Sequence, residues 1–250
     1  DRTWATRVSE RLRHKQRALT PWDYERIVLA RFPELYKVKC LPADPGSPSE
    51  VRLIVVPDIR NRLPFQPFEP KAPQNLLAEV QEYVSAHAPA FAKVTVQNAH
   101  YTAVCVRLGV RFRDRGNEEY YKSKLGEELR RFLCPWAYEE GVDIVIGGRI
   151  YASSIVDFVE RRPYVDYVAG IRFFCGEDEG CLRPVPRAPS SGMSDGDVEG
   201  YYVGSSRPDA VLHTARAHVI DILFDDLYDE ELRSGVDFMK LGFDFIVAAD

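Results

Sequence analysis

The sequence predicts an α+β fold, with short αβ and βαβ-like units, mixed sheets and two subdomains. Helix-start signals at Thr20 and Asn117 alternate along the chain with strand patterns such as the one at residues 101–112. Stretches rich in proline and glycine separate these patterned segments. Apolar residues make up 45% of the 250 residues, which is ordinary for a soluble globular protein.

The first helix signal follows a basic arm or helix at residues 1–17. Thr20 suits the N-cap, Pro21 suits the first helical position, and Asp23 sits where a capping-box acid belongs. These signals predict a helix that ends before Pro33. The chain then reads as two strands, an extended proline-rich loop and an amphipathic helix, at residues 36–41, 51–57, 60–73 and 76–87.

The second half begins with the clearest strand pattern, at residues 101–112, where an apolar face alternates with an arginine-bearing face. Asn117 is expected to cap a helix whose apolar stripe includes Phe132 and Leu133. A further helix is expected where Ser154 and Asp157 have capping-box spacing. Phe158 is one of the residues of this helix that we expect to face the protein core.

These elements predict five parts of the chain. The parts are a basic arm at 1–17, a first α/β subdomain at 18–98, a second at 99–175, an acidic loop rich in Gly, Pro and Ser at 176–208, and returning strands with an acidic C-terminal segment at 209–250. Since the first residue is Asp1, we expect the chain to be a fragment or a processed product.

Charge is polarised along the chain. Residues 1–40 hold ten Lys and Arg against five Asp and Glu, a net charge of +5, whereas residues 176–250 hold six against sixteen, a net charge of −10. Each charged end is either ordinary solvated surface or a surface that contacts an oppositely charged neighbour in an assembly. The candidate residues for such contacts are Arg7, Arg11, Arg13 and Arg17 in the arm and Asp225, Asp226 and Glu230 near the other end.

The motif "FLCPW" is a candidate packing anchor, in which Leu133 and Trp136 hold the end of a helix and Pro135 fixes its exit. Cys134 adjoins that proline and has no histidine near it in the sequence to activate it, so a catalytic role is not expected. His87 has no second histidine at helical spacing for a metal pair.

No nucleophile–base, phosphate-loop or metal-ligand pattern stands out, so we expect no enzyme activity, no cofactor and no metal site. No apolar run approaches the length of a membrane helix, so no membrane insertion is expected. The arginines near residue 110 lack a stacking motif and the chain is acidic overall, so no nucleic-acid partner is expected. The five cysteines, at an odd count and wide spacing, are expected to be reduced.

Several segments together resemble the C-terminal half of baseplate J-like proteins. They are "SERLRHKQRALTPWDYERIVLARFPELYKVKC", a strand ending in "VVPD", "HYTAVCVRLGVRF", "LRRFLCPW", "GGRIYASSIVDFVERRPYVDYVAGIRFF" and "DAVLHTARAHVI". The resemblance spans roughly residues 9–220, and the order of the segments carries it more than any single one. That family supplies wedge components of phage-tail-like contractile injection systems and is related to the inner-baseplate wedge protein of contractile phage tails.

The resemblance implies a structural role in a hexameric ring of wedges around a central spike. The implied partners are a second, paralogous baseplate J-like wedge protein, neighbouring wedges, a small lysozyme-like sheath adaptor and the central spike or hub. The implied location is assembly in the bacterial cytoplasm, followed by a place in a released phage-tail-like particle.

Two other function classes remain open from the sequence. One is a receptor-binding or adhesin-type tail component, which would present an exposed domain with aromatic patches. The other is an enzyme with a scattered active site, in which Asp143, Asp157 and Asp166 converge in space.

Overall fold

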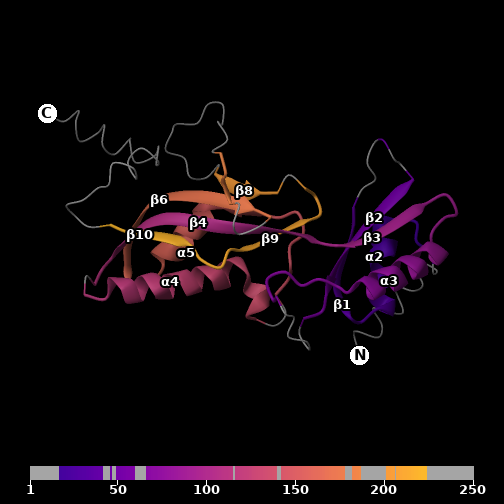
Figure 1. Cartoon of the computed structure of the whole chain (residues 1–250), viewed down its shortest axis with the longest axis horizontal. Coiled ribbons are helices and arrows are strands. Elements are labelled where there is room, and N and C mark those ends of the chain that lie inside the picture. Colours follow the sequence, from indigo (N-terminus) through magenta and orange to yellow (C-terminus); the bar gives the residue numbers. More distant parts are fainter. Residues whose placement is uncertain are drawn as a thin grey trace. The chain divides into compact units, whose positions relative to one another are not determined.

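The chain folds into two compact α+β units, which confirms the predicted fold class (Figure 1). The computed structural model describes residues 17–41, 46, 49–59, 66–114, 116–139, 142–177, 182–186, 201–205 and 207–223. Unit 1 takes its described residues from Asp1–His100, Asp143–Ile146 and Arg207–Val211. Unit 2 takes its described residues from Tyr101–Val142, Gly147–Ser206 and Leu212–Asp250. No helix of the described part is long and apolar enough to cross a membrane.

Unit 1 begins with helix α2 (Pro21–Arg31), and its start confirms the predicted capping box. The Asp23 amide donates to Thr20 Oγ1 at 3.3 Å, and the Thr20 amide donates to Asp23 Oδ2 at 2.8 Å. The two residues therefore satisfy each other's free backbone donors at the helix N-terminus. Tyr24, Ile27 and Val28 form the buried face of the helix.

The sheet of unit 1 is mixed and has the order β1-β2-β3. Strands β1 and β2 pair antiparallel, whereas β2 and β3 pair parallel through the connecting helix α3. Leu53 and Val55 on β2 share one core with Val28 of α2 and Val80 of α3, so both helices cover the same face of the sheet. The elements are β1 (Leu35–Leu41), β2 (Glu50–Pro57), α3 (Gln74–His87) and β3 (Lys93–Asn98).

The two outer strands of this sheet each give an edge amide to a side chain of a covering helix. The Cys40 amide of β1 donates to Glu25 Oε1 of α2 at 2.9 Å. The Val96 amide of β3 donates to Gln81 Oε1 of α3 at 3.3 Å. Each contact satisfies a backbone donor that an edge strand would otherwise leave open to pairing.

The opposite face of the sheet holds a returning segment, residues 143–146. Lys37 Nζ donates to Asp143 Oδ2 at 2.6 Å and to the Ile144 carbonyl at 2.7 Å, and Lys39 Nζ donates to the Ile146 carbonyl at 2.7 Å. Since Val38 points to the helical core, alternation along β1 places both lysines on the other face. Ile144 and Ile146 are buried.

Unit 2 contains a larger mixed sheet of order β10-β4-β6-β7, with β9 also paired to β4. The neighbours β4 and β6 are antiparallel, and β10 joins β4 in parallel. The elements are β4 (His100–Phe112), α4 (Glu118–Leu133), the 3-10 helix η1 (Pro135–Ala137), β5 (Arg149–Tyr151), α5 (Ala152–Glu160), β6 (Val165–Gly176), β7 (Arg183–Pro184), β8 (Tyr202–Gly204), β9 (Ala210–Thr214) and β10 (Val219–Ile222).

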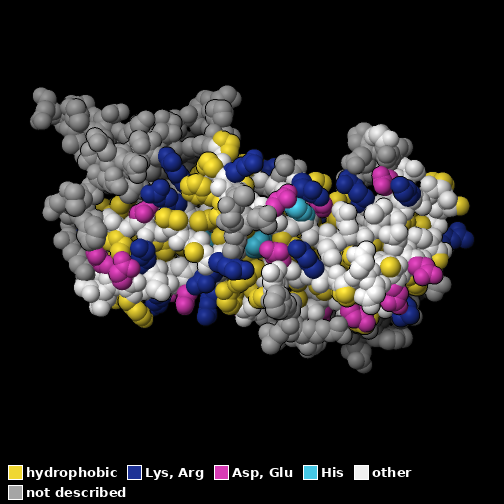
Figure 2. All heavy atoms as spheres, in the orientation of Figure 1, with side chains coloured by type: hydrophobic (Ala, Val, Ile, Leu, Met, Phe, Trp, Pro, Cys, Tyr) yellow, Lys and Arg dark blue, Asp and Glu magenta, His cyan; other side chains and the backbone are white. Residues whose placement is uncertain are grey.

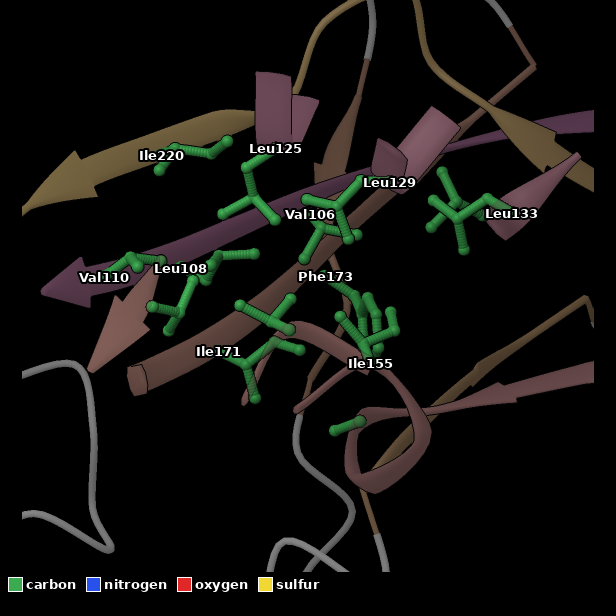
Figure 3. Packing of buried hydrophobic residues seen from close by; sticks show 14 of the residues in the cluster. Val106, Leu108, Val110, Leu125, Leu129, Leu133, Ile155, Ile171, Phe173 and Ile220 are labelled. Carbon is green, nitrogen blue, oxygen red and sulfur yellow. The ribbon is translucent and has the colours of Figure 1, made fainter. Parts of the chain in front are cut away.

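One face of this sheet carries the core of unit 2 (Figure 3). Leucines of α4 at 125, 129 and 133 and Ile155 of α5 point toward apolar side chains of β4, β6 and β10. The labelled strand residues in this core are Val106, Leu108, Val110, Ile171, Phe173 and Ile220. The predicted apolar face of β4 is therefore the face that the helices cover.

A bulge lies at the centre of this sheet, where Gly170 of β6 has no partner between the pairs Leu108–Ile171 and Gly109–Ala169. The register shifts between Leu108 and Gly109, and Gly170 has a φ of 69°. A Cβ on Gly109 would come within 2.6 Å of the Ala169 carbonyl oxygen. Glycine is required at position 109 for this close approach.

Two details of the helices differ from the sequence prediction. Asn117 stands at the N-cap of α4, but its side chain makes no cap hydrogen bond and donates to Asp114 Oδ2 instead. Helix α5 begins at Ala152, with Tyr151 as its N-cap, so the spacing of Ser154 and Asp157 marks no capping box. The position of Asn117 was therefore predicted correctly and only its cap hydrogen bond is missing, whereas the start of α5 was predicted wrongly because spacing alone does not say which residue leaves the helical conformation first.

Candidate assembly surface

The charged residues that the sequence proposed for assembly lie mostly beyond what the structure describes. Arg17 is described and exposed, directly before the fully buried Ala18. Six others lie outside the described residues: Arg7, Arg11, Arg13, Asp225, Asp226 and Glu230. The role of the charged ends therefore stays a prediction.

The "FLCPW" motif lies at the end of α4, where the chain turns into the 3-10 helix. Leu133 is buried in the core of unit 2, and Pro135 is the first residue of that 3-10 helix. Trp136 is half-buried, and its Nε1 atom is buried without a hydrogen-bond partner among the described residues. An indole N–H in this state costs free energy, so any anchoring by Trp136 comes from its apolar ring. The anchoring role stays a prediction.

The three carboxylates that could have formed a scattered active site each have a cationic partner of their own. The shortest distances are 2.6 Å for Asp143 with Lys37, 2.9 Å for Asp157 with Arg161 and 3.5 Å for Asp166 with Arg111. Within the described ranges, no group of three or more His, Cys, Asp and Glu side chains could hold a metal ion. These carboxylates have the contacts of ordinary ion pairs.

A buried polar network joins Cys134 to the chain that returns between β9 and β10. The Thr214 amide donates to Cys134 Sγ at 3.0 Å, and Thr214 Oγ1 lies 3.0 Å from His218 Nε2. Burial raises the pKa of the Cys134 thiol to about 12, and burial together with the charge of Arg130 lowers the pKa of His218 to about 4. At neutral pH this leaves a neutral thiol and a neutral imidazole with Thr214 between them, which suits structure and not nucleophilic catalysis.

The arginine-bearing face of β4 is compensated by acidic side chains. Arg107 Nε lies 2.8 Å from Asp221 Oδ2, and Arg111 Nε lies 3.5 Å from Asp166 Oδ2. Arg111 also lies over the ring of Tyr167, 5.7 Å from its centroid. Arginines that are already matched to carboxylates offer less charge to a phosphate backbone than a bare basic stripe would.

Exposed aromatic rings with arginines over them form two surface patches on unit 2. In the first, which we call the helix patch, Phe132 of α4 stacks on Phe158 of α5 with ring centroids 4.2 Å apart. Arg162 lies over the ring of Phe158 at 4.0 Å from its centroid, and a salt bridge of 3.5 Å to Glu128 holds the guanidinium. Phe132 is 37% exposed.

The second patch, which we call the strand patch, lies on the two-stranded sheet of β5 and β8. Tyr151 and Tyr202 face each other across the strands with ring centroids 5.6 Å apart. Arg149 lies over the ring of Tyr202 at 4.7 Å from its centroid. Tyrosine, phenylalanine and arginine are enriched in protein–protein interfaces, and tyrosine and arginine in their energetic hot spots, so both patches have the composition of a contact surface.

Sequence reasoning missed both patches. It placed Phe132 in the apolar stripe of α4, whereas the structure leaves Phe132 exposed. Phe158 packs against the core of unit 2 as expected, but it is half-buried and also stacks on Phe132. The two members of the strand patch that pair across it, Tyr151 and Tyr202, are 51 positions apart in the chain, so no local pattern connects them. A signal did exist in α4, because Phe132 and Leu133 are adjacent and cannot both point into a narrow helical stripe.

Unit 1 presents a different surface. Helix α3 exposes Glu79 and Glu82, and Asp and Glu side chains gather over this helix in Figure 2. Leu19 and Phe91 are its most exposed large apolar residues among those described, at 66% and 79%. Single exposed apolar residues are common on soluble proteins, so these two do not mark a site by themselves.

Comparisons with known proteins agree with an assembly role. The family model described as "Baseplate protein PVC11-like" matches residues 1–176. Among solved structures, a chain of "Cryo-EM structure of the anti-feeding prophage (AFP) baseplate, 6-fold symmetrised" matches with a TM-score of 0.59 and 18% sequence identity. The match covers 84% of this chain and 40% of that one, so this chain spans less than half the length of its structural relative. None of the curated proteins compared with the chain matches it.

Proposed function

The chain belongs to the PVC11-like baseplate protein family, and we propose that it is a structural wedge component in the baseplate of a contractile injection system. The observation that carries this proposal is the family match over residues 1–176 of 250. The fold it shares with a chain of an assembled baseplate supports the same conclusion. The two aromatic patches supply surfaces with the chemistry of protein contacts.

In this proposed role, the chain pairs with a paralogous baseplate J-like protein to form a wedge. Six of these wedges form a ring around the central spike. Neighbouring wedges, a lysozyme-like sheath adaptor and the spike or hub are the further partners. The particle assembles in the bacterial cytoplasm and is then released. The resemblance to baseplate J-like proteins supports this arrangement, and the order of the resembling segments along the chain is its basis.

A non-enzymatic role is part of the proposal. The paired carboxylates and the neutral Cys134–Thr214–His218 network are its structural support. The receptor-binding alternative would need exposed aromatic patches that stay exposed in the assembled particle. The position of the helix and strand patches in a particle therefore separates the two functions.

A charge reversal in both patches tests the proposal. Arg149→Glu combined with Arg162→Glu removes the two cations that lie over aromatic rings. The matched control combines Lys71→Glu with Lys93→Glu, two exposed lysines of unit 1. Each variant replaces wild type in cells that produce the other baseplate proteins, and electron microscopy counts particles with complete baseplates.

We expect complete baseplates to become rare with the arginine variant and to stay at wild-type numbers with the lysine control. Thermal unfolding of the isolated variants checks that the fold survives, which matters because Arg162→Glu also removes the salt bridge to Glu128. Complete baseplates in wild-type numbers from a folded arginine variant would remove the patches from the proposed interface.

The basic arm gives a second test of the wedge role. Association with the paired wedge protein is measured against ionic strength for wild type and for Arg11→Glu, Arg13→Glu, Arg17→Glu. Exposed ion pairs contribute roughly 0–1 kcal/mol each and are screened by salt, so several together should give wild type the higher affinity and the steeper salt dependence. Equal affinity and equal salt dependence would make the arm ordinary solvated surface.

A further inference from the structure

The last strand of the described sheet, β10, is attached to β4 through a half-buried histidine, His218, that directly precedes it. The Val106 amide of β4 donates to His218 Nδ1 at 3.2 Å. On the other side of the ring, Nε2 lies 3.0 Å from Thr214 Oγ1. The next residues, 219–222, pair in parallel with Arg107 to Val110 of β4.

These contacts fix the protonation state of His218 by geometry. An amide N–H can only donate, so Nδ1 must carry a lone pair and the proton of the neutral ring must sit on Nε2. Nε2–H then donates to Thr214 Oγ1, whose own hydrogen goes to the Ala215 carbonyl at 2.9 Å. Every hydrogen in this chain of bonds has one assignment, and that assignment requires an uncharged ring.

The ionisable groups around His218 do not favour a charge on it. The charge of Arg130 on α4 opposes protonation. Asp221 on β10, which could favour it, is engaged by Arg107 of β4 at 2.8 Å. Other titratable side chains near this network are Cys105 on β4, Cys134 after α4 and His213 on β9. Burial raises the pKa of both thiols, so they stay uncharged and offer the imidazolium no counter-ion.

We propose that His218 is an acid-sensitive latch, which holds β10 on β4 while its ring is neutral and releases that strand when the ring is protonated. Protonation of Nδ1 would set an N–H against the Val106 N–H, so the bond is lost and two donors face each other. The latch concerns how the strand is held and does not depend on the proposed function of the protein.

The pH window follows from the direction of the shift. The pKa of His218 falls from its ordinary value of 6.5 to about 4, first because of burial and then because of Arg130. A released strand exposes the ring to water, so the released state binds a proton already near pH 6.5 and the latched state does not. The latch is therefore at full strength above pH 6.5 and weakens as the pH falls toward 4.

His87 in unit 1 supplies the matched control. Its Nδ1 lies 2.7 Å from the Tyr83 carbonyl, so that nitrogen is the donor. A protonated ring keeps the same bond, because Nδ1 carries a hydrogen in both states. Acid therefore breaks the hydrogen bond of His218 but not that of His87.

The test is amide hydrogen exchange of residues 219–222 between pH 7 and 4.5, corrected for the intrinsic dependence of exchange on pH. In the wild-type chain the released fraction should rise on the order of 50- to 100-fold across this range. His218→Asn keeps a carbonyl acceptor for the Val106 amide but cannot titrate, so its released fraction should change little with pH. His87→Asn should keep the wild-type dependence.

An unchanged pH dependence in a folded His218→Asn variant would overturn the latch. A second measurement needs no variant: the nitrogen chemical shifts of the His218 ring report its tautomer in the wild-type chain. We expect the Nε2–H form at pH 7, and a ring with its proton on Nδ1, or a charged ring, would contradict the proposal directly.

Discussion

The two units have similar architectures, but different kinds of side chain hold their outer or returning strands in place. Each has a mixed sheet with two helices on one face. Unit 1 secures its outer strands with charged or amide side chains that are partly exposed, namely Glu25, Gln81, Lys37 and Lys39. Unit 2 secures its returning strands with neutral groups, namely the buried Cys134 and Thr214 and the half-buried His218.

This difference affects how the units respond to change. A partly exposed side chain that is removed can be replaced by water, so the backbone group it satisfied stays solvated. A buried partner that is removed leaves its neighbour unsatisfied in an apolar surrounding. Polar substitutions and acid should therefore weaken unit 2 more than unit 1.

The largest effect is expected from matched leucines in the two cores. Leu53→Ala in unit 1 and Leu129→Ala in unit 2 each empty a fully buried site, and each should lower the free energy of unfolding by about 2–5 kcal/mol. Hydrogen exchange then shows where the loss falls, because each substitution should reduce protection mainly in its own unit. Equal loss of protection in both units from either variant would mean that they unfold together.

Trp136 allows a sharper test within unit 2. Trp136→Ala removes a half-buried ring and should lower the free energy of unfolding by about 2–3 kcal/mol, below the range for fully buried tryptophan. Trp136→Phe removes the unpartnered indole N–H but keeps a ring, so it should cost about 1 kcal/mol or less. Urea unfolding of both variants measures this, and equal losses would show that the N–H has a partner.

The third prediction compares a hydrogen bond that holds a returning strand in unit 2 with one that holds an edge strand in unit 1. Thr214→Val keeps the shape of the side chain but removes the acceptor of His218, so it should lower the free energy of unfolding by about 1–3 kcal/mol. Gln81→Ala in unit 1 frees the Val96 amide at a partly exposed edge and should lower it by about 0.5–1.5 kcal/mol. A larger loss from Gln81→Ala would reverse the comparison between the units.

Local signals in the sequence predicted the regular elements well. The capping box at Thr20 and the alternation along β4 were visible because each depends on residues that are near in the chain. The alternation also identified which face of β4 meets the helices. Residue spacing alone was less informative, since the spacing of Ser154 and Asp157 marks no capping box and α5 begins at Ala152.

The candidate surface was less predictable because it depends on residues brought together by folding. Arg149 and Tyr202 meet only because β5 and β8, which are far apart in the chain, pair with each other. The segment that Lys37 and Lys39 hold starts 106 positions after Lys37 in the chain. The state of His218 likewise follows from an amide 112 positions away, and no local pattern contains that information.

The parallel pairing of β10 with β4 also has a consequence for the order of events during synthesis. Strand β4 is complete at Phe112, and its antiparallel partner β6 follows by Gly176, but its other partners β9 and β10 begin only at Ala210 and Val219. A chain that emerges from the ribosome in order thus carries one unpaired β4 edge until the last part of the described chain appears. The three strands of unit 1 are all available by Asn98. Nascent chains stalled between positions 176 and 210 are consequently the ones most exposed to edge-to-edge aggregation.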